Sequence, residues 1–169
     1  MNITKSIILN EEEFSPYGRI LTVHSNFKPN RIGSHWKSYS TSGRFKDIIK
    51  FSICAVEIQN QNAIIHEMER HLNYEELIMS GRSTIYLPVA VSKNINNPQE
   101  TPKAENVKVF RLCAGEIIIL NKGVWHAACY SLTEKSIYFF GVGTSYNSIS
   151  QPKMIQLDIP LHIIDDGTK

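Results

Sequence analysis

Two segments far apart in the chain carry side chains that could bind a metal ion. The first, residues 65–76, contains Glu69, His71 and Glu76, and the second contributes His126. Two imidazoles and two carboxylates form a donor mixture that suits a borderline divalent ion. Such an ion could bind a small hydroxy acid and polarise one of its oxygens. We therefore predict a site for one divalent metal (Mn, Ni, Zn or Fe) held by these four residues.

The first of these segments is predicted to be extended, which decides how its side chains are oriented. Side chains alternate between the two faces of a strand, so Glu67, Glu69 and His71 would share one face. A turn after His71 would bring Glu76 back toward them. Glu69 or Glu67 is the candidate catalytic base. Taken singly, the carboxylates could be exposed charges and the histidines structural, so the prediction depends on the joint pattern.

Several basic side chains could bind the carboxylate of a small-molecule substrate, although their spacing selects none of them. They are Lys37, Arg44, Arg82 and Lys122. Tyr138 lies in a predicted strand, one face of which would line the interior of the fold. We take Lys37, Arg82 and Tyr138 as the substrate-binding candidates.

The elements that must position these residues are mostly strands. One short helix is predicted, with Asn10 as its N-cap, three glutamates in its first turn and Gly18 at its end. Polar or glycine-containing turns separate the strands, and none alternates with a long helix, which is typical of a sandwich or barrel. The predicted strands are 19–23, 48–58, 63–71, 83–91, 107–112, 116–120, 124–131 and 136–142.

The composition suits one compact domain spanning residues 1–169, with 42% hydrophobic and 20% charged residues. The formal net charge is +2 with no basic cluster, and the apolar runs are short. We therefore expect neither a nucleic-acid surface nor a membrane span. Three widely spaced cysteines and the lack of a signal-peptide pattern predict reduced thiols in the cytoplasm. Cys113 and Cys129 are expected to be buried as small hydrophobic residues.

The spacing of the four predicted ligands resembles that of the cupin family. Its first motif is similar to H-x-H-x(3–4)-E, and its second ends in G-x-x-H. Glu69 stands in place of the first histidine, His71 matches the second, Glu76 the acid and His126 the last histidine. Together with the strand pattern, the resemblance implies a mainly β fold: a small cupin barrel of the jelly-roll type, with a short N-terminal helix.

A narrower resemblance is to the ureidoglycolate lyase family, also called ureidoglycolate hydrolase. Residues 65–71 resemble its h-E-x-E-R-H motif, residues 123–128 resemble v-W-H-H-P-L, and residues 14–18 match F-x-x-Y-G. The resemblance implies a homodimeric barrel that cleaves ureidoglycolate to glyoxylate and urea in allantoin and purine catabolism.

The chain departs from this family around the expected pocket. Glu76 replaces a glutamine, Ala127 a histidine, residues 141–143 an Asp-Arg-Gly sequence, and Lys37 an arginine. The departures leave three interpretations open. The first is a metal-dependent lyase on ureidoglycolate. The second is another metal-dependent cupin enzyme, an isomerase or oxygenase, on a sugar or keto acid. The third is a barrel that binds a small molecule without turnover.

Overall fold

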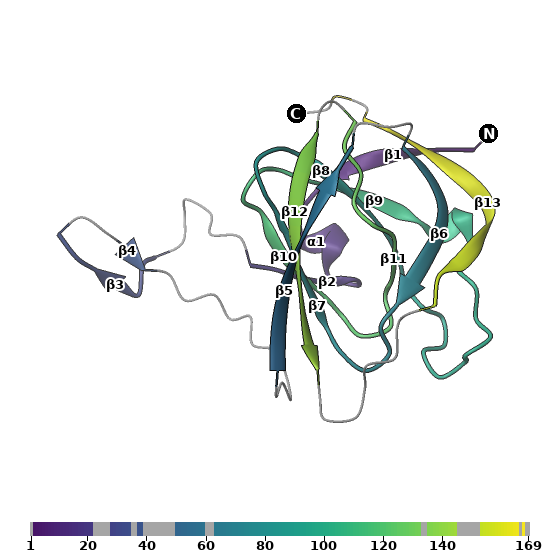
Figure 1. The fold of residues 1–169 in the computed structure, drawn as a ribbon, viewed down its shortest axis with the longest axis horizontal. Coiled ribbons are helices and arrows are strands. Elements are labelled where there is room, and N and C mark those ends of the chain that lie inside the picture. The colour runs from purple at the N-terminus through teal and green to yellow at the C-terminus, as the bar shows by residue number, and fades with distance from the viewer. Residues whose placement is uncertain are drawn as a thin grey trace.

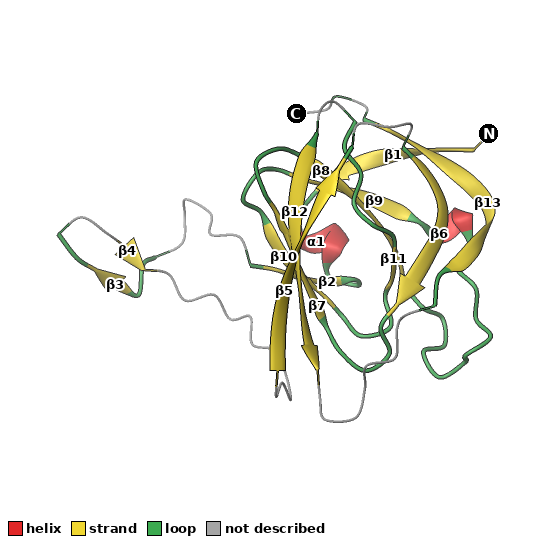
Figure 2. Ribbon diagram, viewed as in Figure 1, coloured by secondary structure: helices red, strands yellow, loops and turns green. Residues whose placement is uncertain are grey.

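Two β layers form the body of the protein (Figure 1). The computed structural model describes residues 2–21, 28–34, 37–38, 50–59, 63–132, 135–144, 153–165 and 167. Figure 2 shows that strands account for nearly all of its regular structure, with helix confined to short pieces.

The first layer is a closed barrel of six strands. In hydrogen-bonded order they are β1 (Asn2–Ile8), β13 (Ile155–Ile164), β6 (Ile64–Arg70), β11 (Trp125–His126), β8 (Ile85–Ala90) and β9 (Lys108–Leu112). The ring closes because β1 pairs in parallel with both β13 and β9. The other neighbours in the ring are antiparallel.

The second layer is a five-stranded antiparallel sheet. Its order is β2 (Gly18–Ile20), β10 (Ile117–Leu120), β7 (Glu76–Ser80), β12 (Ser136–Thr144) and β5 (Lys50–Ile58). Two further short strands, β3 (Arg31–Ile32) and β4 (Lys37–Ser38), pair only with each other and lie apart from the barrel in Figure 1.

The helical segments are short. The helix α1 (Glu11–Phe14) begins as predicted, because the side-chain oxygen of Asn10 accepts a hydrogen bond of 2.9 Å from the backbone N–H of Glu13. Phe14 is fully buried and anchors the helix. The second segment, η1 (Ala104–Asn106), is a single 3₁₀ turn.

Two hydrophobic cores lie on opposite faces of the strands β6, β11, β8 and β9. Along β8, Leu87 and Val89 face the five-stranded sheet, whereas Tyr86 and Ala90 face the inside of the closed barrel. We call the first the inter-sheet core and the second the barrel core. Because both faces of β8 are buried, this strand holds the two layers in a fixed relation.

The mainly β barrel with a short N-terminal helix is confirmed. The strands β1, β7 and β13 were not among those predicted from periodicity. β1 is mostly exposed and polar, and the pairing of β13 with β6 shifts register between Gln156 and Leu161, which breaks the alternation on which prediction depends. The predicted strand 124–131 is reduced to the two residues of β11 and one isolated bridge at Tyr130.

None of the helices in the described part of the chain is long and apolar enough to cross a membrane.

Candidate metal centre

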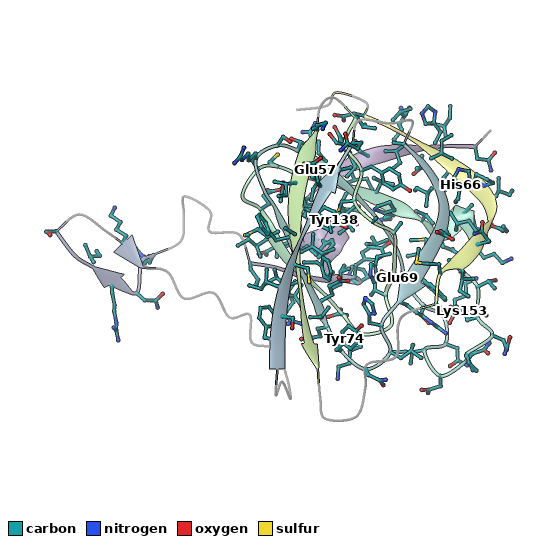
Figure 3. The ribbon with its side chains drawn as sticks, in the orientation of Figure 1. Glu57, His66, Glu69, Tyr74, Tyr138 and Lys153 are labelled. Carbon is teal, nitrogen blue, oxygen red and sulfur yellow. The ribbon has the colours of Figure 1, made fainter. Side chains whose placement is uncertain are left out.

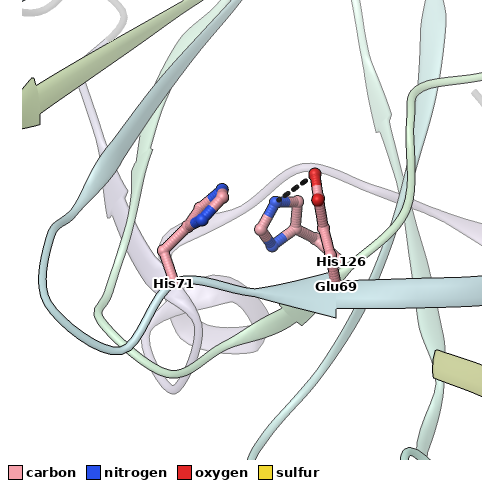
Figure 4. Close-up of side chains that lie close together, drawn as sticks. All are labelled: Glu69, His71 and His126. Carbon is pink, nitrogen blue, oxygen red and sulfur yellow. Dashed lines mark ion pairs between the residues drawn. The ribbon is translucent and has the colours of Figure 1, made fainter. Parts of the chain in front are cut away.

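The antiparallel pairing of β6 with β11 brings the two sequence motifs together. In this register His126 lies opposite Glu69, and Trp125 lies opposite Arg70. Trp125 belongs to the barrel core, so Glu69 and His126 point the other way, into the space between the layers. His71 follows the end of β6. The candidate site therefore begins where these two strands meet, as Figure 4 shows for three of its side chains.

Glu76 reaches the same point from the opposite layer, because it is the first residue of β7 in the five-stranded sheet. Its Oε2 lies 2.9 Å from Nε2 of His126 and 3.4 Å from Nε2 of His71. Oε1 of Glu69 lies 3.7 Å from Nε2 of His126, the contact dashed in Figure 4. One ligand atom each of Glu69, His71 and His126 lie within 4.8 Å of one another. The fold thus brings together all four side chains predicted as ligands.

The orientation of the His126 ring suits metal binding. Its Nδ1 lies 3.1 Å from the backbone carbonyl oxygen of Val124, and a carbonyl can only accept, so Nδ1 donates. In the neutral ring Nε2 then carries the lone pair and points into the site. Metal-bound histidines are commonly oriented by a hydrogen bond of this kind.

Two buried atoms of the site lack a well-formed hydrogen bond. They are Oε2 of Glu76 and Nε2 of His126, which face each other across 2.9 Å. Two lone pairs at that distance repel unless a positive charge lies between them or beside them. A proton or a cation would supply it. Among the described residues, this donor set of two imidazole nitrogens and two carboxylates fits a divalent ion such as Mn, Ni, Zn or Fe.

The electrostatics of the site keep Glu76 ionised. Burial acts to raise the pKa of Glu76, but the adjacent imidazoles of His126 and His71 outweigh it and hold that pKa at about 2. Burial acts to lower the pKa of His126, and the carboxylate of Glu76 outweighs it, so that the pKa of His126 is raised. A permanent negative charge between two imidazoles therefore lies inside the fold.

Two tyrosines flank this charge. The ring of Tyr74 stacks on His71 with centroids 4.5 Å apart and planes at 23°. Burial and the carboxylates of Glu76 and Glu69 raise the pKa of Tyr74. Burial, Cys129 and then Glu76 raise the pKa of Tyr138. Figure 3 shows the two tyrosines on either side of Glu69.

Tyr138, a predicted substrate-binding residue, thus lies in the inter-sheet core near the site. Tyr74 was missed by sequence reasoning. The signal that could have found it is an aromatic residue in the turn between the two predicted ligands His71 and Glu76.

Three other predicted residues lie elsewhere. Glu67 accepts a hydrogen bond of 2.9 Å from the side-chain amide of Gln156 on β13 and is outside the ligand cluster. Arg82 lies in the turn after β7, at the end of that strand remote from Glu76. Lys37 is exposed on β4, apart from the barrel. The structure does not bring these three residues to the metal centre, and their functional roles stay predictions.

The cysteines differ from expectation in one respect. Cys129 is buried as predicted, in the inter-sheet core, where burial and then Glu76 raise the pKa of its thiol. Cys113 is exposed, and the prediction that it is buried was wrong. The reason is its place in the tight turn that joins β9 to β10, where the backbone N–H of Glu116 donates to the carbonyl oxygen of Cys113.

A buried ion pair supports the ligand strand from its other face. The guanidinium of Arg70 lies 4.5 Å from the ring centroid of Trp125 and donates to Glu100 at 2.7 Å and Ser92 at 2.6 Å. It also donates to the backbone carbonyl of Asn97 at 2.5 Å. Arg70 is the residue between Glu69 and His71, so these contacts hold the loop after β8 against the segment that carries two of the predicted ligands.

Comparison with known proteins finds similarity in structure only. The sequence matches no protein-family model and no curated protein. The solved dTDP-4-dehydrorhamnose 3,5-epimerase of Bacillus anthracis, with TDP and pyrophosphate bound, is 15% identical with a TM-score of 0.46. The alignment covers 80% of this chain and 83% of that one.

Two further solved structures are similar to this chain. RmlC of Streptococcus suis, in complex with dTDP-D-xylose, is 16% identical with a TM-score of 0.42. The alignment covers 59% of this chain and 46% of that one, less than half of its length. The dTDP-6-deoxy-D-glucose-3,5-epimerase of Legionella pneumophila, in complex with dTDP-4-keto-L-rhamnose, is 12% identical with a TM-score of 0.43. The coverage is 76% of this chain and 73% of that one. Similarity at this level assigns no activity to this chain.

Proposed function

We propose that this protein is a metal-dependent enzyme in which Glu69, His71, Glu76 and His126 hold one divalent ion. The observation that carries the proposal is the buried carboxylate of Glu76, whose Oε2 lies within 3.4 Å of two imidazole nitrogens without a well-formed hydrogen bond. A bound ion would act as a Lewis acid toward an oxygen of the substrate.

The four residues would have different tasks. His126 is fixed in orientation by Val124, and Glu76 is the most deeply enclosed of the carboxylates. The side chain of Glu69 is 25% exposed, against 9% for Glu76, and its 3.7 Å contact with His126 is longer than the 2.9 Å contact of Glu76. Glu69 is therefore the residue best placed to take a proton from a substrate, which supports its role as the general base.

For the substrate class, we favour a sugar or keto acid and an isomerisation by proton transfer. Several motif residues shared with the ureidoglycolate lyase family are buried or closely packed and stabilise the fold. Phe14 is fully buried, and a Cβ at Gly18 would come within 1.9 Å of the backbone oxygen of Ile119. Trp125 packs in the barrel core against Arg70. The resemblance thus supports a common fold more than a common substrate, whereas Glu76 completes a ligand set that the family lacks.

A lyase reaction on ureidoglycolate is the second candidate. It is favoured by His71 and His126, which stand at the positions that the resemblance marks and lie with ring centroids 5.0 Å apart in one site. The same base, Glu69, would take the proton of the substrate hydroxyl while the C–N bond breaks, and an acid would protonate the leaving nitrogen to give urea.

Metal analysis followed by a substrate panel tests the proposal. The purified chain is stripped with a chelator, reloaded separately with Mn²⁺, Fe²⁺, Ni²⁺ or Zn²⁺, and analysed for bound metal. We expect about one ion per chain, and loss of it in Glu76→Gln. Each loaded form is then given keto sugars, keto acids and ureidoglycolate. Proton exchange with deuterated water supports the isomerase, glyoxylate release supports the lyase, and oxygen uptake with iron supports an oxygenase.

The absence of any stoichiometric metal in the parent protein would overturn the proposal. Stoichiometric metal with tight ligand binding and no turnover would instead support a binding protein without enzymatic activity.

A further inference from the structure

The turn between the two ligands His71 and Glu76 is held from outside the site. The carboxylate of Glu75 accepts two hydrogen bonds from the guanidinium of Arg19 on β2, at 2.8 and 3.0 Å. Glu75 is largely buried, with 12% of its side chain exposed. Two-point pairing of this kind fixes direction as well as distance. The turn is therefore a rigid support for the residue before Glu75.

That residue is Tyr74, and its ring covers His71. The two rings are nearly parallel at 4.5 Å, and Tyr74 is only half-buried whereas His71 is buried. Tyr74 thus lies between the histidine and solvent. In the view of Figure 3 Tyr74 and Tyr138 are labelled on opposite sides of Glu69.

The phenol of Tyr74 is available to a ligand. No residue in the described part of the chain forms a hydrogen bond with its hydroxyl. A tyrosine hydroxyl carries a proton at neutral pH and can donate it in a hydrogen bond.

We propose that Tyr74 is a specificity-determining residue of the metal site, whose ring forms one wall and whose hydroxyl donates a hydrogen bond to an oxygen of the bound substrate. The inference rests on the proposed metal-dependent function. It goes beyond that function because it says where the substrate is recognised, namely on the side of the site where the Tyr74 ring covers His71. A small oxygen-rich molecule with two ligand oxygens and a further acceptor matches this arrangement.

The test separates the hydroxyl from the ring. Tyr74→Phe keeps the stack on His71 and removes only the donor, whereas Tyr74→Ala removes both. The chain is loaded with Co²⁺, whose visible spectrum reports its ligands, and is titrated with glycolate as a small hydroxy-acid probe. Tyr86→Phe is the matched control, because its hydroxyl bonds Asp165 at 2.6 Å, away from the metal centre.

We expect Tyr74→Phe to bind Co²⁺ within about twofold of the parent and to bind glycolate roughly threefold to tenfold more weakly, the range for one lost hydrogen bond. Tyr74→Ala should bind glycolate more weakly than Tyr74→Phe does. Tyr86→Phe should bind glycolate with the affinity of the parent. Unchanged glycolate affinity in Tyr74→Phe with Co²⁺ bound would overturn this inference and leave the metal proposal standing. Failure of the parent to bind Co²⁺ would overturn both. Thermal unfolding of each variant checks that it is folded.

Discussion

At the scale of single residues, Glu76 supplies the buried negative charge of the candidate metal centre. Among the four proposed ligands it alone comes from the five-stranded sheet, and it places a carboxylate with a pKa of about 2 between two imidazoles of the opposite layer. The free-energy cost of burying this carboxylate is offset by the charge and the hydrogen bonds of the two adjacent imidazoles. A neutral side chain of the same shape keeps the packing and removes that charge, so Glu76→Gln isolates the electrostatic contribution.

We expect Glu76→Gln to weaken divalent metal binding by at least about tenfold, because an ionised ligand becomes a neutral amide. Isothermal titration of the stripped protein measures the change. Glu67→Gln is the matched control, because Glu67 contacts Gln156 rather than the four proposed ligands. The metal affinity of this variant should stay within about twofold of that of the parent. Equal affinity of Glu76→Gln and the parent would contradict the assignment of Glu76 as a ligand.

At the scale of elements, the site depends on a two-residue strand. β11 contributes only Trp125 and His126, yet it pairs with both β6 and β8. This short pairing is reinforced from the barrel side by Arg70. Its guanidinium lies over the ring of Trp125 and forms an ion pair with Glu100 in the loop after β8.

The Arg70 to Glu100 pair is expected to be worth far more than a surface pair. The two side chains are only 6% and 13% exposed, so Glu100→Gln leaves a buried guanidinium with a weaker partner. We expect a loss of about 3 kcal/mol in the free energy of unfolding, measured by urea denaturation.

The exposed pair of Lys135 and Glu57 provides the comparison for that experiment. Their side chains are 70% and 63% exposed, so Lys135→Met should change the free energy of unfolding by less than about 0.5 kcal/mol. Similar losses in the two variants would show that burial does not strengthen the Arg70 pair.

The same elements explain what could be predicted from sequence. His71 and Glu69 alternate on one strand, and a short turn must return Glu76, so their convergence follows from local geometry. The approach of His126 depends on the pairing of β11 with β6, which no local pattern specifies. The motif spacing indicated it only through resemblance. Lys37 and Arg82 were selected by charge alone, and charge does not determine which end of a barrel a residue occupies.

At the scale of the whole molecule, the two ends of the chain close the barrel together. β1 pairs with β13, and Asp165, just after β13, accepts hydrogen bonds from Ser6 at 2.9 Å and Tyr86 at 2.6 Å. Arg111 of β9 adds an ion pair at 3.6 Å. One carboxylate thus links three strands of the ring with the C-terminal segment.

The stability of this closure should fall in acid. The hydrogen bond from Tyr86 and then that from Ser6 lower the pKa of Asp165 below its ordinary value of 3.8. A carboxylate with a depressed pKa stabilises the fold fully above its unfolded pKa, and the contribution is lost as the pH falls through its folded pKa. Asp165→Asn should therefore lower the melting temperature at pH 7 and differ less from the parent near pH 3.

Differential scanning fluorimetry across that pH range measures the effect. Asp158→Asn is the control for a carboxylate outside the closure, since Asp158 caps Ala104 at 2.9 Å and pairs with Lys103. A gap between Asp165→Asn and the parent that is as large at pH 3 as at pH 7 would contradict the assigned contribution.

Glu76 belongs to one layer, and Glu69 and His126 belong to the other. An ion held by all of them would be a cross-link between two sheets that otherwise adhere mainly through side-chain packing. Separation of the two sheets during unfolding would then require release of the ion. The concentration of free metal would therefore affect the lifetime of the folded state as well as the activity.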